Sequence, residues 1–282
     1  MKHYVKTWEW KMHPESDLAA ERHRADTCAE GVEYETERCC IGSWEHVKIS
    51  SDEGARSVGR PIGNYRTLNT PRLDLLDFDG IEDAKNEIAG ALCSVFDTLS
   101  VFPSRILVVG LGNEALAPDA VGPLAASKVR ATMHISELDP SMFSALECSE
   151  IAVIKTGVFG QSGLDSAFVI KGVCDLVKPS AVIAVDSLAA GSEKRLGTTV
   201  QISDTGIFPG TGLGFGRRAV NRELLGVPVI AIGVPTVMDS RILGGTDDGL
   251  FVCPKDINAV VDAAAEIIAG GINQAFGLDA PF

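Results

Sequence analysis

The sequence predicts an α/β protein with three layers, in which a twisted, mostly parallel sheet is covered by helices on both faces. Three apolar runs, 106–110, 181–185 and 227–234, have the length of strands and lack polar alternation. Segments with apolar residues at helical spacing, such as 81–100, separate or flank these runs. Strands that are apolar on both sides and alternate with helices are typical of a parallel sheet buried on both faces.

The first part of the chain, residues 1–70, is polar and irregular. Some alternation at 33–40 and 45–50 predicts a hairpin there. The turn-rich stretch 61–71 connects this region to the α/β core. We therefore divide the chain into an irregular, partly β-rich region at 1–70 and an α/β core at 71–282.

Four helices and two further strand segments are predicted in the core. The helices are expected at 81–100, 119–131, 164–179 and 254–276. The second of them opens at Asp119 in spite of Pro123. The additional strand segments are expected at the start of 150–163 and of 198–214, and each runs into a glycine-rich turn or loop.

Charge and composition disfavour several classes of protein. The formal net charge is −13, whereas general nucleic-acid binding needs a basic surface. No apolar run reaches about 18 residues, and the N-terminus lacks the apolar stretch of a secretory signal, so we expect no membrane span. The seven cysteines are odd in number and form no CxxC, which favours reduced thiols in a cytoplasmic protein over a zinc site or a disulfide framework.

Carboxylates follow the predicted strands, where α/β sheets place their sites. Asp119 lies just past the turn after the first apolar run, Asp186 ends the second, and Asp239 follows the third. Taken singly, Asp119 is explained as a helix N-cap, and Asp186 as the cap of a turn through the amide of Ser187 or Leu188. As a pair, Asp119 and Asp186 could share a proton, so that one acts as base on a water and the other as acid. The same oxygens could instead hold a hard divalent metal.

Two other motifs are weak. Residues 110–115 match GxGxxA, the dinucleotide fingerprint, but Pro118 delays the helix that should start within the glycines. Sharp turning of the chain explains these glycines equally well. Ser187 is not part of a GxSxG elbow, and the serine in 160–164 has no evident histidine partner, which disfavours serine catalysis.

Three further side chains are candidates that each have a structural alternative. His134 follows the helix that opens at Asp119, where it could serve as a third polar group of the site, although a lone histidine is more often structural. Lys155 and Arg195 lie near predicted strand ends and could bind substrate carboxylates or an oxyanion. Exposed salt bridges are the alternative for both.

Longer motifs resemble a known family. They are VVGLGNEALAPDAVGP at 108–123, VIAVDSLAAGSEKRLGTTVQISDTGIFPGTGLG at 182–214 and GVPVIAIGVPTVMD at 226–239. The likeness extends to ESDLAAE at 15–21 and to 251–273, so that it covers nearly the whole chain. The family is the germination protease of endospore-forming bacteria. A more distant similarity is to the hydrogenase maturation endopeptidases, which share the strand–GxGN–acid and strand–Asp layout.

The resemblance implies an endopeptidase that degrades small acid-soluble spore proteins when germination begins, by an atypical aspartic peptidase mechanism. Its two catalytic aspartates fall on Asp119 and Asp186, and Asn113, Asp204 and Thr205 would shape the site by hydrogen bonding. No cofactor or metal is expected. In the maturation endopeptidases the corresponding acids bind a metal, so a metal-dependent processing peptidase that uses the same two aspartates is the alternative.

The resemblance also implies regulation and assembly. The family is made as a zymogen that trims its own N-terminus, and the matching region predicts Asp17–Leu18 as the bond that is cut. Residues 1–70 would then contain a pro-segment ahead of a peptidase core. A homotetramer in the cytoplasm of the forespore, or spore core, is implied as well, with spore proteins as partners and no direct contact with nucleic acid.

Three departures from the family pattern bear on substrate preference, processing and activation. Phe208 stands in GIFPG where the family usually has GIHPG, and FGRR at 215–218 replaces a lysine-rich stretch. ESDLA at 15–19 replaces the more familiar RTDLA. Both aspartates are in place, and the chain resembles a divergent member. Phe208 is the feature that supports a third alternative, a non-catalytic relative that binds spore proteins without cutting them.

Overall fold

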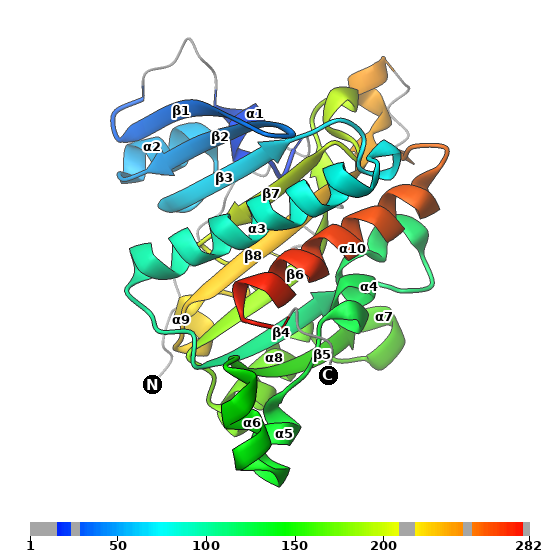
Figure 1. Cartoon of the computed structure of the whole chain (residues 1–282). Helices are drawn as coiled ribbons and strands as arrows, with labels where there is room; N and C mark the ends of the chain where they lie inside the picture. Colours follow the sequence, from blue (N-terminus) through cyan, green and yellow to red (C-terminus); the bar gives the residue numbers. More distant parts are fainter. Residues whose placement is uncertain (1–15, 24–28, 209–217, 245–249, 279–282) are drawn as a thin grey trace.

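Nine strands form one mixed sheet in the computed structural model, which describes residues 16–23, 29–208, 218–244 and 250–278. Helices cover both faces of this sheet (Figure 1), so the predicted α/β class is confirmed. The strands are β1 (Val32–Cys39), β2 (Gly42–Ile49), β3 (Gly63–Asn69), β4 (Arg105–Leu111), β5 (Glu150–Gly157), β6 (Ala181–Ala190), β7 (Thr199–Ser203), β8 (Val229–Asp239) and β9 (Phe251–Val252).

The sheet combines a parallel and an antiparallel half. Its strand order is β1-β2-β3-β7-β8-β6-β4-β5, with β9 paired to β8. The strands β5, β4, β6 and β8 run parallel, whereas each pairing that involves β1, β2, β3, β7 or β9 is antiparallel. The apolar runs thus predict the parallel half. The connection 191–198 between β6 and β7 is shorter than the dozen or so residues of a parallel crossover, so β7 runs the other way.

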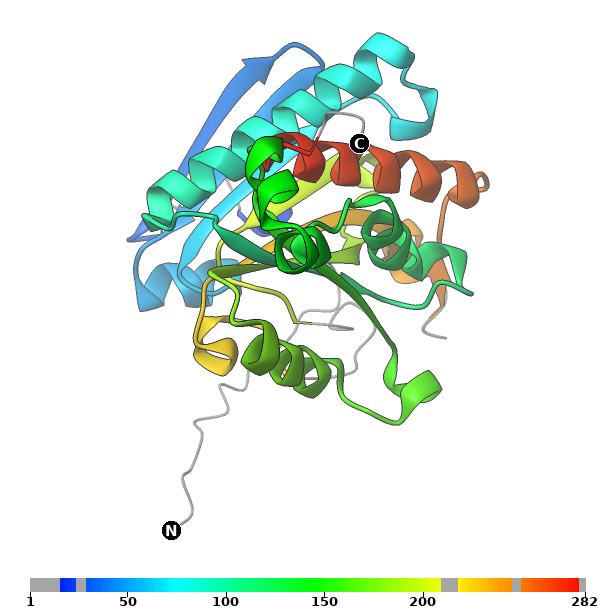
Figure 2. The ribbon, with the colours of Figure 1, turned by 60° about the horizontal axis from the view of Figure 1, so that its bottom comes forward.

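Two layers of helices enclose the sheet (Figure 2), with α3, α4 and α10 on one face and α8 and α9 on the other. The helices are α1 (Ala19–Arg22), α2 (Asp52–Val58), α3 (Phe78–Leu99), α4 (Val121–Lys128), α5 (Met133–Leu138), α6 (Pro140–Leu146), α7 (Phe159–Ser162), α8 (Ser166–Val177), α9 (Arg222–Leu225) and α10 (Ile257–Ala275). Short 3₁₀ turns are η1 (Leu73–Leu75), η2 (Ala117–Asp119), η3 (Glu193–Arg195) and η5 (Ser240–Leu243).

The central strands are apolar throughout because both of their faces are buried. In β4, Ile106 and Val108 pack into the core beneath α3 and α10, whereas Leu107 and Val109 pack into the core beneath α8. All four side chains are fully buried. Removal of this apolar area from water on both sides of the sheet drives the three layers together.

The N-terminal region contains the predicted hairpin. β1 and β2 pair antiparallel over their whole length, and β3 continues the meander. β3 also pairs with β7, where Tyr65 lies opposite Ser203, so that these three strands extend the core sheet. The boundary at residue 70 stays a prediction.

Candidate active site

A cavity of about 300 Å³ lies beyond the carboxyl end of β4, and Asp119 and Asp186 both line it. Its walls come from η2, from the middle of β6, β7 and β8, and from the N-terminal segment at Asp17. Asp186 stands one position past the last β4–β6 pair, Gly110–Val185. The structure therefore brings the two predicted carboxylates together at the edge of the sheet where α/β proteins bind their ligands.

The turn after β4 fixes Asp119. Gly112 has a φ of +111°, and a Cβ atom on it would lie 2.1 Å from the Asp119 carbonyl oxygen, so this position requires glycine. The amide of Asn113 donates to both the carbonyl oxygen (3.0 Å) and the Oδ2 atom (2.9 Å) of Asp119. The carboxylate is thus held back toward the turn. It does not cap α4, which begins at Val121 after Ala120.

Close packing of α4 on the sheet brings Asp119 toward Asp186. A Cβ atom on Gly122 would lie 2.1 Å from the Leu111 carbonyl oxygen and 2.3 Å from that of Val185. The helix can approach β4 and β6 this closely only because Gly122 has no side chain. The hydroxyl of Thr236 on β8 donates to the Pro118 carbonyl oxygen at 2.6 Å and ties η2 to the third strand of the site.

Asp186 is 6% exposed and lines the cavity. Its Oδ1 atom accepts a hydrogen bond from the amide of Ser187 at 2.9 Å, one of the two contacts that the turn alternative named. In register, Asp186 lies beside Gly233 of β8, and Gly233 lies beside Gln201 of β7. Because Gly233 has no side chain, the side chain of Leu188 packs over it, and a Cβ atom on Gly233 would lie 2.5 Å from Leu188 Cγ.

The N-terminal segment is docked at this cavity. The amide of Asp17 donates to the carbonyl oxygen of Ala189 at 2.8 Å, and the amide of Ala189 donates to Asp17 Oδ2 at 2.9 Å. Arg60 Nη2 lies 3.0 Å from Asp17 Oδ1. Leu18 is fully buried in the core beneath α8. The proposed processing bond, Asp17–Leu18, therefore lies at the cavity that both aspartates line.

Glu21 anchors the same segment from its other end. Its Oε2 atom accepts from the Gly191 amide at 2.6 Å and from the Ser16 hydroxyl at 2.5 Å. The Ser16 Oγ atom in turn accepts from the amide of Leu18 at 3.0 Å. These bonds close a tight turn around Asp17 and hold it against the end of β6.

The other sequence candidates take different places. Thr205 lines the cavity, whereas Asp204 accepts bonds from the Asn64 amide (2.8 Å) and side chain (2.6 Å) and joins the end of β7 to β3. Asn113 positions Asp119 through its backbone, and its Oδ1 atom accepts from Gln161 at 2.7 Å. His134 is exposed on α5, which precedes β5 at the amino end of the parallel strands, so the structure does not bring it to the site.

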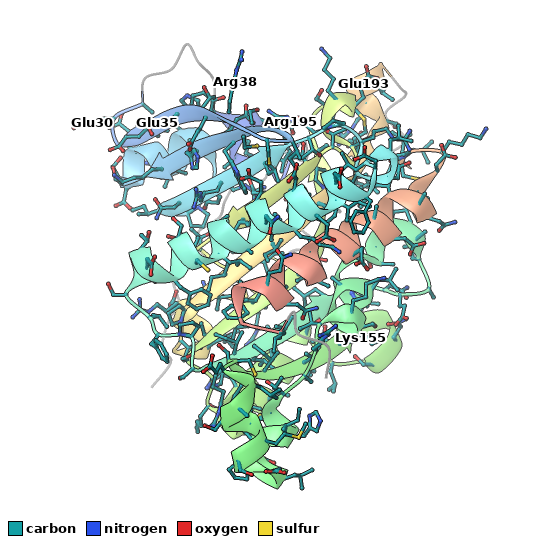
Figure 3. The ribbon with its side chains drawn as sticks, viewed as in Figure 1. Glu30, Glu35, Arg38, Lys155, Glu193 and Arg195 are labelled. Atoms are coloured by element: carbon teal, nitrogen blue, oxygen red, sulfur yellow. The ribbon has the colours of Figure 1, made fainter. Side chains whose placement is uncertain are left out.

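Salt bridges account for the two candidate cations. Lys155 Nζ lies 2.9 Å from Glu114 Oε2, and Arg195 Nη1 lies 2.8 Å from Glu45 Oε2. The two cations occupy different parts of the molecule (Figure 3). Burial alone would raise the pKa of Glu45, but hydrogen bonds from Arg195, Asn69 and Tyr34 outweigh it and lower that pKa. The structural alternative is therefore the better description of Lys155 and Arg195.

Asp239, the third strand-end carboxylate, is structural. It is 3% exposed and accepts from the backbone amide and the guanidinium of Arg241, which holds the pKa of its carboxyl below the usual range. Phe208, the departure from the family pattern, lines the cavity. Residues 215–217 of the second departure lie outside the described residues.

Arg60 and Gln201 are residues of the site that the sequence analysis missed. Arg60 is 43 residues from Asp17 in the chain. Gln201 is 182 residues from Ala19, and its side-chain oxygen accepts a hydrogen bond from the Ala19 amide. No local spacing connects such positions. The one signal at hand was that Gln201 belongs to the QISDTG block on which the family resemblance rests.

Metal and membrane features were searched within the described ranges. No group of three or more His, Cys, Asp or Glu side chains there could hold a metal ion. Six of the seven cysteines lie in the described part of the chain, and all six are free thiols. Within the same ranges, none of the helices has the length and apolar character needed to cross a bilayer.

Comparison with known proteins identifies the family. The model of the germination protease family matches residues 11–248. The chain belongs to the germination protease family. The match includes Asp17, Arg60, Asp119, Asp186 and Gln201.

Individual germination proteases give the extent of the likeness. One from Caldanaerobacter subterraneus subsp. tengcongensis is 42% identical over 196 residues, which span 69% of this chain and 59% of that protein. One from Clostridium perfringens (strain SM101) is 31% identical over 92% of this chain and 94% of its own length. Among solved structures, a NiFe hydrogenase maturation protease from Thermococcus kodakarensis has 22% identity and a TM-score of 0.36, covering 65% of this chain and 99% of that one.

Proposed function

We propose that this member of the germination protease family is an endopeptidase in which Asp119 and Asp186 activate a water molecule. It first cuts its own chain at Asp17–Leu18 and then degrades small acid-soluble spore proteins at germination. The observation that supports this most directly is the docking of Asp17 at the cavity lined by both aspartates, where it pairs with Arg60 and Ala189. Hydrolysis requires the peptide bond and the acid–base pair to share one site, and Asp17, Asp119 and Asp186 line the same cavity.

The chemistry needs one carboxylate and one carboxylic acid. The ionised member of the pair takes a proton from water, whose oxygen adds to the carbonyl carbon of Asp17. The carbonyl oxygen takes up the negative charge. The bond from that carbon to the Leu18 nitrogen then breaks, the nitrogen receives a proton from the acid member, and Asp17 is left with a new α-carboxyl group. Because the two carboxyls interact, their protonation belongs to the pair and not to either residue alone.

The cut separates two parts of the chain that are held differently. Leu18 and Ala19 are fully buried, and the Glu21 carboxylate is bonded to the Gly191 amide. Asp17, by contrast, is held by polar contacts with Arg60 and Ala189. Residues from Leu18 onward therefore stay in the fold, whereas residues 1–17 leave and open the cavity to other substrates.

Substrate, assembly and location are proposed from the family. Small acid-soluble spore proteins are the substrates, the chain acts as a homotetramer, and it works in the spore core. The net charge of −13 is consistent with a protein that acts on other proteins without binding DNA itself.

The test is a time course of the full chain and of an added small acid-soluble spore protein, followed by mass spectrometry. Wild type is compared with Asp119→Asn and Asp186→Asn, and Asp97→Asn on the exposed surface of α3 is the matched control. We expect a product that begins at Leu18, followed by defined cuts in the spore protein, in wild type and in the control only. Each protein is also assayed with chelator, because sensitivity to it would make the two aspartates metal ligands. Stable binding of the spore protein without cuts would identify the non-catalytic relative.

A further inference from the structure

Gln201 contacts the backbone on both sides of Leu18. It is 8% exposed on β7 and lines the cavity. Its Nε2 atom donates to the carbonyl oxygen of Asp17 at 3.2 Å, and its Oε1 atom accepts from the amide of Ala19 at 2.8 Å. The oxygen that Gln201 contacts is the carbonyl oxygen of the bond proposed to be cut.

The second contact fixes which way the side-chain amide points. An N–H group such as that of Ala19 can bond only to an acceptor, so the oxygen of Gln201 must face Ala19. This orientation of the Gln201 side-chain amide directs its Nε2 donor toward Asp17. The bond to the Ala19 amide is buried and the bond to the Asp17 carbonyl is partly buried, so both are electrostatically stronger than they would be in open water.

Strand register places Gln201 across β8 from Asp186. Gln201 and Asp186 are both in register with Gly233, one on each side of it. Residues in register project to the same face of a sheet, and two strand spacings separate their Cα atoms by about 10 Å. The carbonyl that Gln201 contacts therefore belongs to a residue, Asp17, that lines the same cavity as Asp186 and Asp119.

We infer that Gln201 is a further catalytic residue, whose Nε2 amide stabilises the negative charge that develops on the Asp17 carbonyl oxygen during hydrolysis. The inference rests on the proposed function, because it assumes that water adds to this carbonyl. A preorganised donor that is already in place when charge develops lowers the barrier more than it strengthens ground-state binding. The contact of 3.2 Å is longer than an ideal bond and shortens as the oxygen becomes an anion.

Gln201→Glu separates this role from simple docking of the segment. The glutamate keeps an acceptor for the Ala19 amide but, when ionised, has no donor for the Asp17 carbonyl. Gln201→Leu removes both functions. The same Gln→Glu change at Gln274, on α10 and away from the cavity, is the matched control. The full chain is used in every case. The rate of appearance of the product beginning at Leu18 is measured, together with hydrogen exchange at the Ala19 amide in an Asp186→Asn background.

At neutral pH we expect Gln201→Glu to process its chain on the order of 100-fold more slowly than wild type, with the Ala19 amide still protected. As the pH falls, the glutamate gains a proton and regains an O–H donor. Its ordinary pKa is about 4.3, and burial raises it. The ratio of wild-type to variant rates should therefore shrink with falling pH, whereas Gln274→Glu should match wild type throughout.

Three outcomes overturn the inference. Processing of Gln201→Glu at the wild-type rate shows that no donor is needed at the carbonyl. Slow processing together with a freely exchanging Ala19 amide assigns Gln201 to docking alone, and so does a rate ratio that does not change with pH. Absence of any cut in wild type instead refutes the proposed function, so the two failures are distinguishable.

Discussion

The ion pair between Arg60 and Asp17 should set how firmly the N-terminal segment stays docked. The two side chains are only 14% and 12% exposed, and the closest atoms lie 3.0 Å apart. At that distance the gross Coulomb attraction is about 5 kcal/mol for an effective dielectric constant of ~20. The cost of desolvating both charges offsets part of this attraction, so we expect a net coupling free energy of about 2 kcal/mol.

A double-mutant cycle measures this coupling through hydrogen exchange at the Ala19 amide. That amide bonds to Gln201 only while the segment is docked, so its exchange reports the opening free energy. All proteins contain Asp186→Asn to prevent processing during the measurement. We expect Arg60→Gln and Asp17→Asn each to accelerate exchange by about 30-fold, because about 1.4 kcal/mol corresponds to a factor of ten.

The double variant decides whether the two effects share one origin. If they do, the Ala19 amide of the double variant should exchange about as fast as that of either single variant. Independent effects would instead multiply to an acceleration of roughly 900-fold. Arg56→Gln is the matched control, since Arg56 is exposed on the neighbouring α2 and bonds to the Asp52 carbonyl oxygen. Additive acceleration in the double variant, or an equal effect of Arg56→Gln, would refute the role of the ion pair.

Three further outcomes are expected. Asp119→Asn and Asp186→Asn should each slow processing by about 100-fold or more, as measured by mass spectrometry, with little change in Tm. Gly122→Ala should destabilise the fold by roughly 1–3 kcal/mol in urea, because its Cβ would meet two strand carbonyls, whereas Gly90→Ala, with open space around it, should be neutral or stabilising. Glu45 has a lowered pKa in the fold, so its ionised form adds stability above its unfolded pKa and loses that contribution as the pH falls through the folded pKa. The difference in urea midpoint between wild type and Glu45→Gln should accordingly disappear in acid.

The fold class and the carboxylate pair were predictable because both follow from local patterns. An apolar run without alternation indicates a strand buried on both faces, and the ends of parallel strands meet at one edge. Asp119 and Asp186 each follow such a run, so their approach needs no knowledge of any long-range contact. The hairpin of β1 and β2 was predicted, but the antiparallel joining of this region to the core sheet through β7 was not, since the direction of β7 depends on the length of a connection and not on its own residues.

The docking of the N-terminal segment could not be predicted in the same way. Arg60 precedes β3 and Gln201 lies on β7, and these two strands become neighbours only when the meander joins the core sheet. Before that pairing exists, nothing in the spacing of Asp17, Arg60 and Gln201 connects them. The contact among these three residues depends on the order of the strands in the sheet, and the apolar pattern of the sequence does not determine that order.

Gly233 is a position where the sequence itself indicated close packing, because a glycine stands inside an apolar strand. It interrupts the apolar run of β8, and a glycine inside a strand often marks a close approach of a ligand or of another backbone. A Cβ atom at this position would lie 2.5 Å from Leu188 Cγ, so the glycine lets the Leu188 side chain pack onto β8 beside Asp186. The glycine weakens the strand but allows this close packing, and Gly233 and Leu188 both line the cavity. The same residue therefore explains both the break in the apolar pattern and the close packing of β6 and β8 at the wall of the cavity.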